Sequence, residues 1–438
     1  MTLRWLAIQV WRYRVTGLMV ILSVTFLLVI VGTHLLQHSS SFNFHQGRIK
    51  IPMKASDPKQ RHNILTHDHT KESNTLKDRT DSTLHKIKRR NPPVVFLKTH
   101  KTGSSTVQNL LFRVGEKEGA TFAFPAHTYQ FSYPHKFKVD FVDELPEGSS
   151  HFDILCSHMR LDVGQLKQMM PPDTVYVTIL REPVQMFESV FSYYTFAVPA
   201  FTSAKKAAGH RSALSVFLES PESFWDPNER GNGLGKNPMS FDLGLDNQQW
   251  NWSRPANLTL LEETFQLVMI AEHFDESLVL LGDLLKLDLE ELASVSHNTR
   301  SAYSLSPLDN ITKARIRDWN QLDVWLYDFF LRVFWQRAER YGLGRLNRDV
   351  ALLRASTERI RQKCVARKQV PPAELDDLIR PWQTDSVTIT GYHIQKNLTK
   401  QEQGFCMRLV LPELQYHAHL YFQQYGRAVG PLPTVTHK

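Results

Sequence analysis

Residues 96–106, with the sequence FLKTHKTGSST, have the types and spacing to bind an anion and act on it. They join an apolar run to a helix that we expect to begin near Ser105. At such a helix start, free backbone N–H groups and the positive end of the helix dipole point at one spot. Gly103 lets the backbone approach a ligand closely, and the lysines add mobile charge. The predicted anion-binding residues are Lys98, Thr99, His100, Lys101, Thr102, Gly103, Ser104, Ser105 and Thr106.

The order of lysine and glycine separates this loop from the loop of nucleoside triphosphatases. The pattern GxxxxGK[ST] places its lysine after the second glycine, whereas Lys101 precedes Gly103. An ordinary triphosphatase is therefore disfavoured. The other alternative is a Ser/Thr-rich turn that only caps a helix. The buried strand expected in front of the loop and the second lysine, Lys98, favour an anion site over that alternative.

A second candidate phosphate contact follows a different apolar run. Residues 175–180 predict a buried strand, and Arg181, Glu182 and Pro183 come directly after it. Proline is well tolerated in a first helical turn. An arginine at the carboxyl end of a strand faces the crevice in which open α/β sheets bind ligands. The motif R-[DE]-P is common and weak by itself, and Ser189 in the following helix is the candidate partner of Arg181.

Four apolar runs predict the strands that must position these loops, at residues 94–97, 152–156, 175–180 and 267–270. Short apolar runs of this kind are typical of buried parallel strands. Because helical patterns lie between them, we predict an α/β fold with a central parallel sheet covered on both faces. Beyond about residue 277 the apolar period becomes helical, which predicts a helical C-terminal part.

The N-terminal residues predict a membrane anchor. Residues 15–36 contain no Lys, Arg, Asp or Glu, and a helix of that length crosses about 30 Å of hydrocarbon. Arginines precede this run and no Lys or Arg follows it until Arg48, which predicts a lumenal C-terminal side. A cleaved signal peptide is the rival interpretation. The expected organisation is a cytosolic tail at 1–14, an anchor at 15–36, a stem at 37–91 and a lumenal catalytic domain at 92–438.

The three cysteines are too few for a disulfide scaffold, and their spacing matches no zinc pattern. One disulfide and one free thiol is the simplest arrangement. Because an oxidising lumen favours disulfides and Cys364 and Cys406 both lie in the C-terminal part, we predict that they pair and that Cys156 is buried in a strand. Four glycosylation sequons fall on the predicted lumenal side, at Asn251, Asn257, Asn310 and Asn397.

The chain of 438 residues has a formal net charge of +8 and a pI near 9.2. This charge suits an anionic partner without choosing among phosphate, nucleic acid, anionic lipid and acidic sugar. Nucleic acid is disfavoured, because the basic residues lie mainly in the predicted stem and around the phosphate loops. Aromatic residues do not alternate with them in the way that stacks bases. The sequence indicates no oligomeric state.

The loop and three later segments resemble the galactose 3-O-sulfotransferases. This family of Golgi enzymes uses 3′-phosphoadenosine-5′-phosphosulfate and includes the galactosylceramide enzyme. The later segments are CSHMR at 156–160, FDLGLDN at 241–247 and HFDESLVLL at 273–281. The loop is specific for the sulfotransferase superfamily, and the later segments narrow the resemblance to galactose 3-O transfer. The resemblance spans about residue 92 to the early 420s and implies a three-layer, P-loop-like sulfotransferase fold.

The resemblance also implies roles for the candidate residues. The loop is similar to the 5′-phosphosulfate loop of the family, and Arg181 with Ser189 is similar to its 3′-phosphate motif. Lys101 is expected to stabilise the leaving phosphate. A base must take the proton of the acceptor hydroxyl. We expect His158, just after the strand at 152–156, to do so, with His100 as the competing candidate. This chemistry requires no metal.

The predicted reaction is sulfuryl transfer from this donor to the 3-hydroxyl of a terminal β-galactose. Glycolipids, O-glycans and N-glycans are all open as acceptors, and the protein is expected to be a single-pass type II protein of the Golgi membrane. The alternatives are transfer to another sugar position or to a glycosaminoglycan, a nucleotide kinase, and a non-catalytic lumenal glycan-binding protein. The carboxylates Glu182, Asp246 and Glu276 are expected to form structural salt bridges.

Overall fold

The structure is a computed structural model of the chain, and it describes residues 91–248, 256–301 and 307–430. The predicted tail and anchor, and all of the predicted stem except Asn91, lie outside these ranges. Within them, no helix is both long enough and apolar enough to cross a membrane.

In the described part of the chain, a parallel sheet of four strands forms the centre of the fold. Its strands are β1 (Val94–Leu97), β2 (Ile154–Leu155), β3 (Val175–Leu180) and β4 (Leu267–Ile270), in the order β2-β1-β3-β4. Every strand residue is buried. Leu97 at the end of β1 pairs with Thr178 of β3, so the loops that follow these two strands leave the same edge of the sheet. The predicted parallel sheet is confirmed.

The strand predicted at residues 152–156 is shorter than expected. Only Ile154 and Leu155 pair with β1. Asp153 accepts a hydrogen bond from the backbone N–H of Val94 in β1 and donates its own N–H to the carbonyl of Thr121 on the other side. Cys156 is buried as predicted, but it follows β2 and does not lie in the strand.

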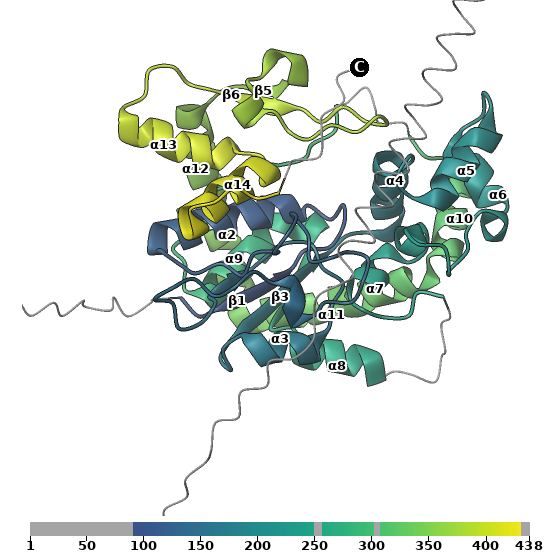
Figure 1. Ribbon diagram of the computed structural model, residues 1–438, viewed down its shortest axis with the longest axis horizontal. Helices are drawn as coiled ribbons and strands as arrows, with labels where there is room; N and C mark the ends of the chain where they lie inside the picture. Colours follow the sequence, from purple (N-terminus) through teal and green to yellow (C-terminus); the bar gives the residue numbers. More distant parts are fainter. Residues whose placement is uncertain (1–90, 249–255, 302–306, 431–438) are drawn as a thin grey trace, which may run out of the picture. The chain divides into compact units, whose positions relative to one another are not determined.

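Helices cover the sheet on both faces, as predicted. In Figure 1, α2 (Ser104–Glu118) and α9 (Phe274–Leu285) lie on one side of the strands, and α3 (Val163–Met169) lies on the other. The other helices before the C-terminal part are α4 (Pro183–Tyr193), α5 (Pro199–Ala208), α6 (Ala213–Glu219), α7 (Pro238–Asp242) and α8 (Ala256–Thr264).

The C-terminal part is helical, as predicted, but it also contains a two-stranded antiparallel sheet that the sequence did not indicate. Its helices are α10 (Asn310–Trp319), α11 (Gln321–Tyr341), α12 (Leu343–Cys364), α13 (Lys400–Val410) and α14 (Glu413–Tyr425). The last residue of α12 leads directly into β5 (Val365–Val370), which pairs with β6 (Gly391–Ile394). The side chains around this small sheet form a second apolar core, separate from the core around the parallel sheet.

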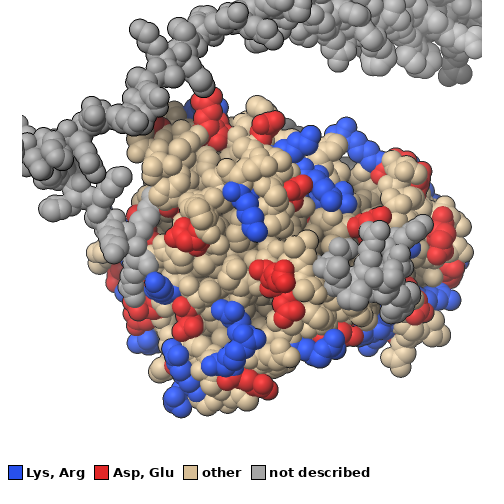
Figure 2. All heavy atoms as spheres, turned by 90° about the horizontal axis from the view of Figure 1, so that it is seen from below, with Lys and Arg blue, Asp and Glu red and all other residues tan. Residues whose placement is uncertain are grey.

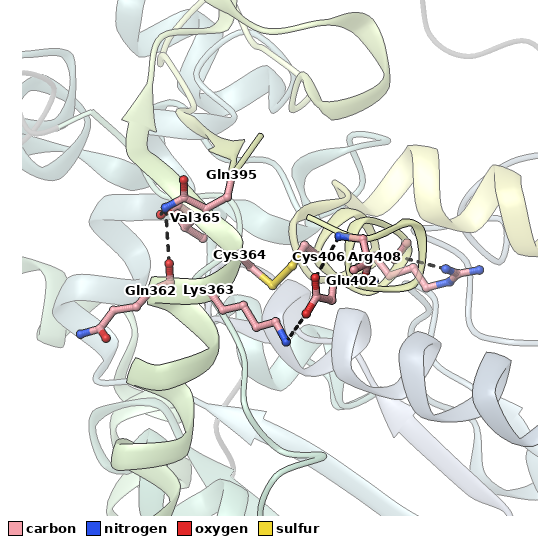
Figure 3. Close-up of a disulfide and its surroundings, with 10 residues drawn as sticks. Gln362, Lys363, Cys364, Val365, Gln395, Glu402, Cys406 and Arg408 are labelled. Carbon is pink, nitrogen blue, oxygen red and sulfur yellow. Dashed lines mark hydrogen bonds and ion pairs between the residues drawn. A yellow bond between two sulfur atoms is a disulfide. The ribbon is translucent and has the colours of Figure 1, made fainter. Parts of the chain in front are cut away.

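The predicted disulfide between Cys364 and Cys406 is confirmed, and it links the end of α12 to α13 (Figure 3). Both cysteines are buried. An ion pair of 2.7 Å between Lys363 and Glu402 joins the same two helices. The disulfide therefore fixes α13, the helix that directly precedes α14.

The last helix lies beside the first described one. α14 packs along α2, although the two come from opposite ends of the described chain (Figure 1). The hydroxyl of Tyr416 in α14 donates to the carboxylate of Glu116 in α2 over 2.8 Å. Arg408 of α13 donates to the same carboxylate through two nitrogens, at 2.7 and 2.8 Å. These contacts hold the end of α13 and the first turn of α14 against the last turn of α2.

Two of the four predicted glycosylation sites lie on the described surface. The side chains of Asn310, at the start of α10, and Asn397, after β6, are exposed. Asn251 and the side chain of Asn257 lie outside the described part of the chain. Glycosylation at all four sites stays a prediction.

Candidate active site

A cavity of about 1080 Å³ lies at the carboxyl ends of the parallel strands. Lys98 follows β1, His158 lies beyond β2 and Arg181 follows β3, and all three line the cavity. Open α/β sheets bind ligands at this edge. The cationic side chains that line the cavity are Lys98, Lys101, Arg181 and Arg300. On the outer face shown in Figure 2, by contrast, Lys and Arg are interspersed with Asp and Glu.

The loop between β1 and α2 forms a tight turn at the start of the helix. Lys101 and Gly103 have left-handed backbone conformations, with φ of 59° and 86°, and glycine adopts such a φ without steric cost. α2 begins at Ser104, one residue before the predicted start. Its N-terminus forms part of the cavity wall, which is where a helix binds anions. The loop residues that line the cavity are Lys98, Lys101, Gly103, Ser104 and Ser105.

The other predicted loop residues lie behind the cavity wall and hold the turn in place. The hydroxyl of Thr99 donates to the carbonyl of Ile179 in β3 over 2.5 Å and lies 2.8 Å from the hydroxyl of Thr102. The hydroxyl of Thr106 accepts from the backbone N–H of His297 over 3.1 Å. The predicted residues that do not line the cavity are Thr99, His100, Thr102 and Thr106.

Arg181 and Ser189 lie in the same cavity as the loop. Arg181 Nη1 donates to the carbonyl of Lys101 over 3.0 Å, which ties this guanidinium to the loop. α4 begins two residues after Arg181, and its buried residue Ser189 lines the cavity. The two predicted phosphate motifs are therefore brought together.

A segment that the sequence did not indicate completes the cationic wall. Arg300 donates to both carboxylate oxygens of Glu188 in α4, at 2.9 and 2.5 Å. Two residues earlier, Asn298 Nδ2 donates to the hydroxyl of Ser105 over 2.8 Å. The segment therefore connects α4 with the start of α2. Its sequence offers only a polar run with one arginine, which does not distinguish a cavity wall from a surface loop.

Lys101 shows the electrostatic effect of this gathered charge. Its ammonium lies 3.9 Å from the ring centre of Tyr193, within cation–π range. Burial, and then the charges of Arg300 and Lys98, lower the pKa of Lys101 to about 7. A bound anion favours the charged form of a lysine and opposes this shift. The wall is therefore suited to an anionic ligand.

His158 lines the cavity and contacts Lys98 through both ring nitrogens. Its Nδ1 lies 2.9 Å from the Lys98 carbonyl oxygen, and its Nε2 lies 2.7 Å from the Lys98 ammonium. Burial, and then the Lys98 charge, hold the pKa of His158 well below its ordinary value. The ring is therefore neutral at physiological pH.

His100 stacks on His158, with ring centres 4.1 Å apart, but it lies behind the cavity wall. Its Nδ1 lies 2.9 Å from the carboxylate of Asp242 in α7. That buried carboxylate also accepts from the His100 backbone N–H and the Tyr133 hydroxyl, both at 2.8 Å. Asp323 of α11 in turn accepts two backbone N–H bonds at the start of α7. The orientation of His100 is thus fixed from two helices.

Glu413, the first residue of α14, brings a carboxylate into this cationic cavity. Its Oε2 accepts from the Lys98 ammonium over 2.9 Å and from the Ser105 hydroxyl over 3.0 Å. Burial alone would raise the pKa of Glu413, but the Lys98 charge and these hydrogen bonds hold that pKa below its ordinary value. The carboxylate is therefore ionised. No pattern in the sequence indicates this carboxylate, because Glu413 stands 315 residues after Lys98.

The cavity also has an aromatic and polar lining. Residues 126–133 run along it, and an isolated parallel bridge between Gln130 and His158 holds them beside β2. The aromatic side chains that line the cavity are Tyr129, Tyr133, Phe141, Tyr193, Tyr194 and Trp382. Aromatic rings combine a large apolar face with polar tips, which suits a ligand that has both C–H and hydroxyl faces. In the described ranges, no group of three or more His, Cys, Asp or Glu side chains could hold a metal ion.

A parallel sheet with an anion-binding turn and clustered cations at its carboxyl edge defines a protein that binds a phosphorylated ligand. The comparison with known families narrows this class. The model of the family described as galactose-3-O-sulfotransferase matches residues 7–424. The chain therefore belongs to the galactose-3-O-sulfotransferase family, and the resemblance noted from the sequence is confirmed.

Individual relatives agree with this assignment. Galactose-3-O-sulfotransferase 3 of Mus musculus is 40% identical over 345 residues, which cover 76% of this chain and 78% of that protein. Galactose-3-O-sulfotransferase 2 of Sus scrofa is 40% identical over 343 residues, or 76% of this chain and 84% of that protein. Galactosylceramide sulfotransferase of Homo sapiens is 38% identical over 328 residues, or 74% and 76% of the two chains.

Proposed function

We propose that this protein transfers a sulfuryl group from 3′-phosphoadenosine-5′-phosphosulfate to the 3-hydroxyl of a terminal β-galactose on a glycoprotein or glycolipid glycan. Membership of the galactose-3-O-sulfotransferase family supports this reaction. The observation that carries the proposal is the meeting of the loop after β1 with Arg181 and Ser189 in one cavity. A donor with two separate phosphate ends requires two such sites.

The donor would lie with its phosphosulfate against the start of α2. Gly103, Ser104 and Ser105 line the cavity there, and helix N–H groups bind phosphate oxygens well. Arg181 and Ser189 would hold the 3′-phosphate, because arginine binds phosphate through several N–H groups. When bound, the donor supplies an activated sulfuryl group with adenosine 3′,5′-bisphosphate as its leaving group.

The residues of the loop after β1 that line the cavity would stabilise the charge that develops on that leaving group. Lys101 is assigned to this task, because it lies in the cationic cluster beside the helix start. Of the two histidines predicted as the base, His158 lines the cavity and His100 does not. His100 and Asp242 would instead support the ring of His158 from behind.

The acceptor would pack on the aromatic side chains of the cavity. Trp382 and Tyr129 are among its lining residues, and such rings can pack on the C–H face of a galactose ring. Lys98, His158 and Glu413 line the same cavity, and the acceptor hydroxyl would meet the sulfuryl group beside them.

The topology that we propose is that of a single-pass type II protein with its catalytic domain in the Golgi lumen. The apolar run at 15–36 and the arginines before it support this topology. The disulfide between Cys364 and Cys406 also supports it, because disulfides persist in oxidising compartments. Intact Golgi vesicles should protect the C-terminal domain from added protease, and cleavage of that domain in intact vesicles would contradict the topology.

The reaction is tested by giving the full-length chain in detergent a donor carrying labelled sulfate. N-acetyllactosamine, lactose and galactosylceramide serve as acceptors, and a 3-O-methyl galactoside is the matched acceptor whose reacting position is blocked. We expect label on the free galactosides, with linkage analysis placing sulfate on O3, and none on the blocked one. Transfer to the blocked galactoside would contradict the 3-hydroxyl as acceptor. Donor binding without any transfer would contradict the enzyme activity.

A further inference from the structure

The Lys98 ammonium lies between two groups that could take up a proton. His158 Nε2 is 2.7 Å from it and Glu413 Oε2 is 2.9 Å from it. All three side chains line the cavity. The position of the hydrogens in this group decides which side chain is free to act on a hydroxyl.

The contacts of His158 leave neither ring nitrogen free. A carbonyl oxygen only accepts hydrogen bonds, so Nδ1 carries a hydrogen and donates it to the Lys98 carbonyl. Lys98 is paired with the carboxylate of Glu413, so its ammonium is charged and donates to Nε2. The only lone pair of the neutral imidazole is thus already used. The geometry makes His158 a positioning residue for Lys98.

Glu413 can accept a further hydrogen bond, whereas His158 has no free ring nitrogen. Its Oε2 receives both hydrogen bonds, from Lys98 and Ser105, and in the described part of the chain no donor reaches its Oε1. The side chain is 16% exposed and lines the cavity. A carboxylate accepts up to four hydrogen bonds, so Oε1 is available to a ligand hydroxyl.

A carboxylate is an unexpected side chain in a cavity built for an anion. A negative charge there opposes the binding of a phosphorylated donor. Yet Glu413 is held in place by the anion loop itself, through Lys98 and Ser105. Its orientation is further fixed because α14 packs on α2 and follows the disulfide-linked α13. Such a carboxylate is suited to a reaction that also needs a proton acceptor.

We propose that Glu413, and not His158, accepts the proton of the attacking galactose hydroxyl; this inference rests on the proposed function. The galactose oxygen forms a bond to sulfur as the bond from sulfur to the bridging phosphate oxygen breaks. The electron pair of that bond stays on the 5′-phosphate of adenosine 3′,5′-bisphosphate, beside Lys101. The hydroxyl proton moves to Glu413 Oε1 and later to water. Lys98 and Ser105 hold the carboxylate throughout.

The competing explanation is that Glu413 only neutralises the buried charge of Lys98. The variant Glu413→Gln separates the two, because glutamine keeps the shape and an oxygen acceptor for Lys98 and Ser105 but does not take up a proton. A purely structural role predicts weaker binding of adenosine 3′,5′-bisphosphate or a lower melting temperature, with kcat at saturating donor little changed. A role in proton transfer predicts a much lower kcat, with little change in nucleotide binding or melting temperature.

The experiment measures kcat for lactose at saturating donor, and the Kd of adenosine 3′,5′-bisphosphate, in the full-length chain. We expect E413Q to lower kcat by about 10²–10⁴-fold, the contribution typical of a general base, with little change in the nucleotide Kd. His158→Gln should keep well over a tenth of the wild-type kcat, because its amide oxygen can still accept from Lys98. Glu290→Gln, on the surface far from the cavity, is the matched control.

Two results would overturn the proposal. One is an E413Q protein that keeps more than about a tenth of the wild-type kcat, since loss of a base costs far more. The other is an H158Q protein that loses as much kcat as E413Q. If E413Q does not fold, Glu413→Asp keeps a carboxylate and is compared on lactose and on the lactose analogue with fluorine in place of the 2-hydroxyl of its galactose, which makes the galactose 3-hydroxyl more acidic. The kcat deficit of E413D should shrink on the analogue, and an equal deficit on both acceptors would overturn the proposal.

Measurements on the wild-type protein distinguish a failure of this inference from a failure of the proposed function. A wild-type protein that binds adenosine 3′,5′-bisphosphate but transfers no sulfate to any galactoside contradicts the proposed function itself. A wild-type protein that transfers sulfate, beside an active E413Q, contradicts only the role of Glu413.

Discussion

The two walls of the cavity are built in different ways. One wall is the loop from Lys98 to Ser105, a contiguous segment between a buried strand and a helix. The adjoining wall begins at Glu413, and the disulfide, α13 and the packing of α14 on α2 hold it there. The loop wall is cationic, and the α14 wall supplies the carboxylate that faces it.

This difference shows which chemical role is filled by one short segment of the sequence and which needs residues from distant segments. Binding an anion needs backbone N–H groups, a helix start and lysines, and one short segment supplies all of them. Taking up a proton needs a further group, and Glu413 comes from a distant part of the sequence. Lys98 and Ser105 connect the two walls, because both donate hydrogen bonds to the Glu413 carboxylate.

A large effect on kcat is also expected from breaking the loop wall. Lys101→Ala removes the positive charge proposed to stabilise the leaving phosphate, and loss of one such group lowers kcat by about 10²–10³-fold. Initial rates at saturating donor and lactose measure it. Lys205→Ala, on the exposed face of α5, is the control and should leave kcat unchanged. A K101A protein with wild-type kcat would remove Lys101 from the mechanism.

A smaller effect is expected at the site proposed for the 3′-phosphate, where Arg181 lies beside the loop wall. Arg181→Ala should weaken the binding of adenosine 3′,5′-bisphosphate by about 10–100-fold, because a hydrogen bond to a charged group contributes about 1.5–3 kcal/mol. Titration calorimetry measures this change. Adenosine 5′-monophosphate lacks the 3′-phosphate, so R181A should bind it nearly as the wild type does. An equal loss for both nucleotides would show that Arg181 does not read the 3′-phosphate.

The α14 wall is tested by removing the disulfide that precedes it. The variant C364S/C406S opens a bridge that spans 42 residues, and the loop-closure entropy of such a bridge corresponds to about 4 kcal/mol of unfolding free energy. Urea unfolding measures this loss. Reducing agent should destabilise the wild type and leave the double variant unchanged. Equal stability of the oxidised wild type and the variant would mean that the bridge does not stabilise this wall.

The smallest effect is a pH dependence of donor-product binding. Because the pKa of Lys101 is lowered to about 7, the ammonium is charged below that pH and neutral above it. The affinity for adenosine 3′,5′-bisphosphate should therefore fall as pH rises from 7 to 8, by less than about tenfold per pH unit. In Lys101→Arg the charge persists, so this part of the pH dependence should vanish. A dependence that survives in K101R would belong to another group.

The parts of the fold that were predictable are those with local signals. The strands at 94–97, 175–180 and 267–270 were each a short, mainly apolar run, and their bounds are confirmed. The disulfide followed from the number and placement of three cysteines. β5 was missed because its residues show neither the alternation of apolar and polar side chains typical of a strand nor a helical apolar period. Its four central residues are exposed and only its two ends are buried.

The site was predictable to the same extent. The motif residues Lys101, Arg181, Ser189 and His158 all line one cavity, because each follows a parallel strand or lies in the helix after it. Arg300 and Glu413 were missed because tertiary packing alone brings them there. Sequence alone also did not separate the lining residues of the loop from those behind it, such as Thr99, because that depends on which side of the turn each side chain takes.

The most direct test of the central claim is a structure of the full chain with adenosine 3′,5′-bisphosphate and lactose bound together. We predict the 5′-phosphate at the start of α2, the 3′-phosphate at Arg181 and Ser189, and the galactose 3-hydroxyl within hydrogen-bond distance of Glu413. A nucleotide bound outside this cavity, or a 3-hydroxyl directed away from the start of α2, would contradict the claim that the two walls meet to transfer sulfate.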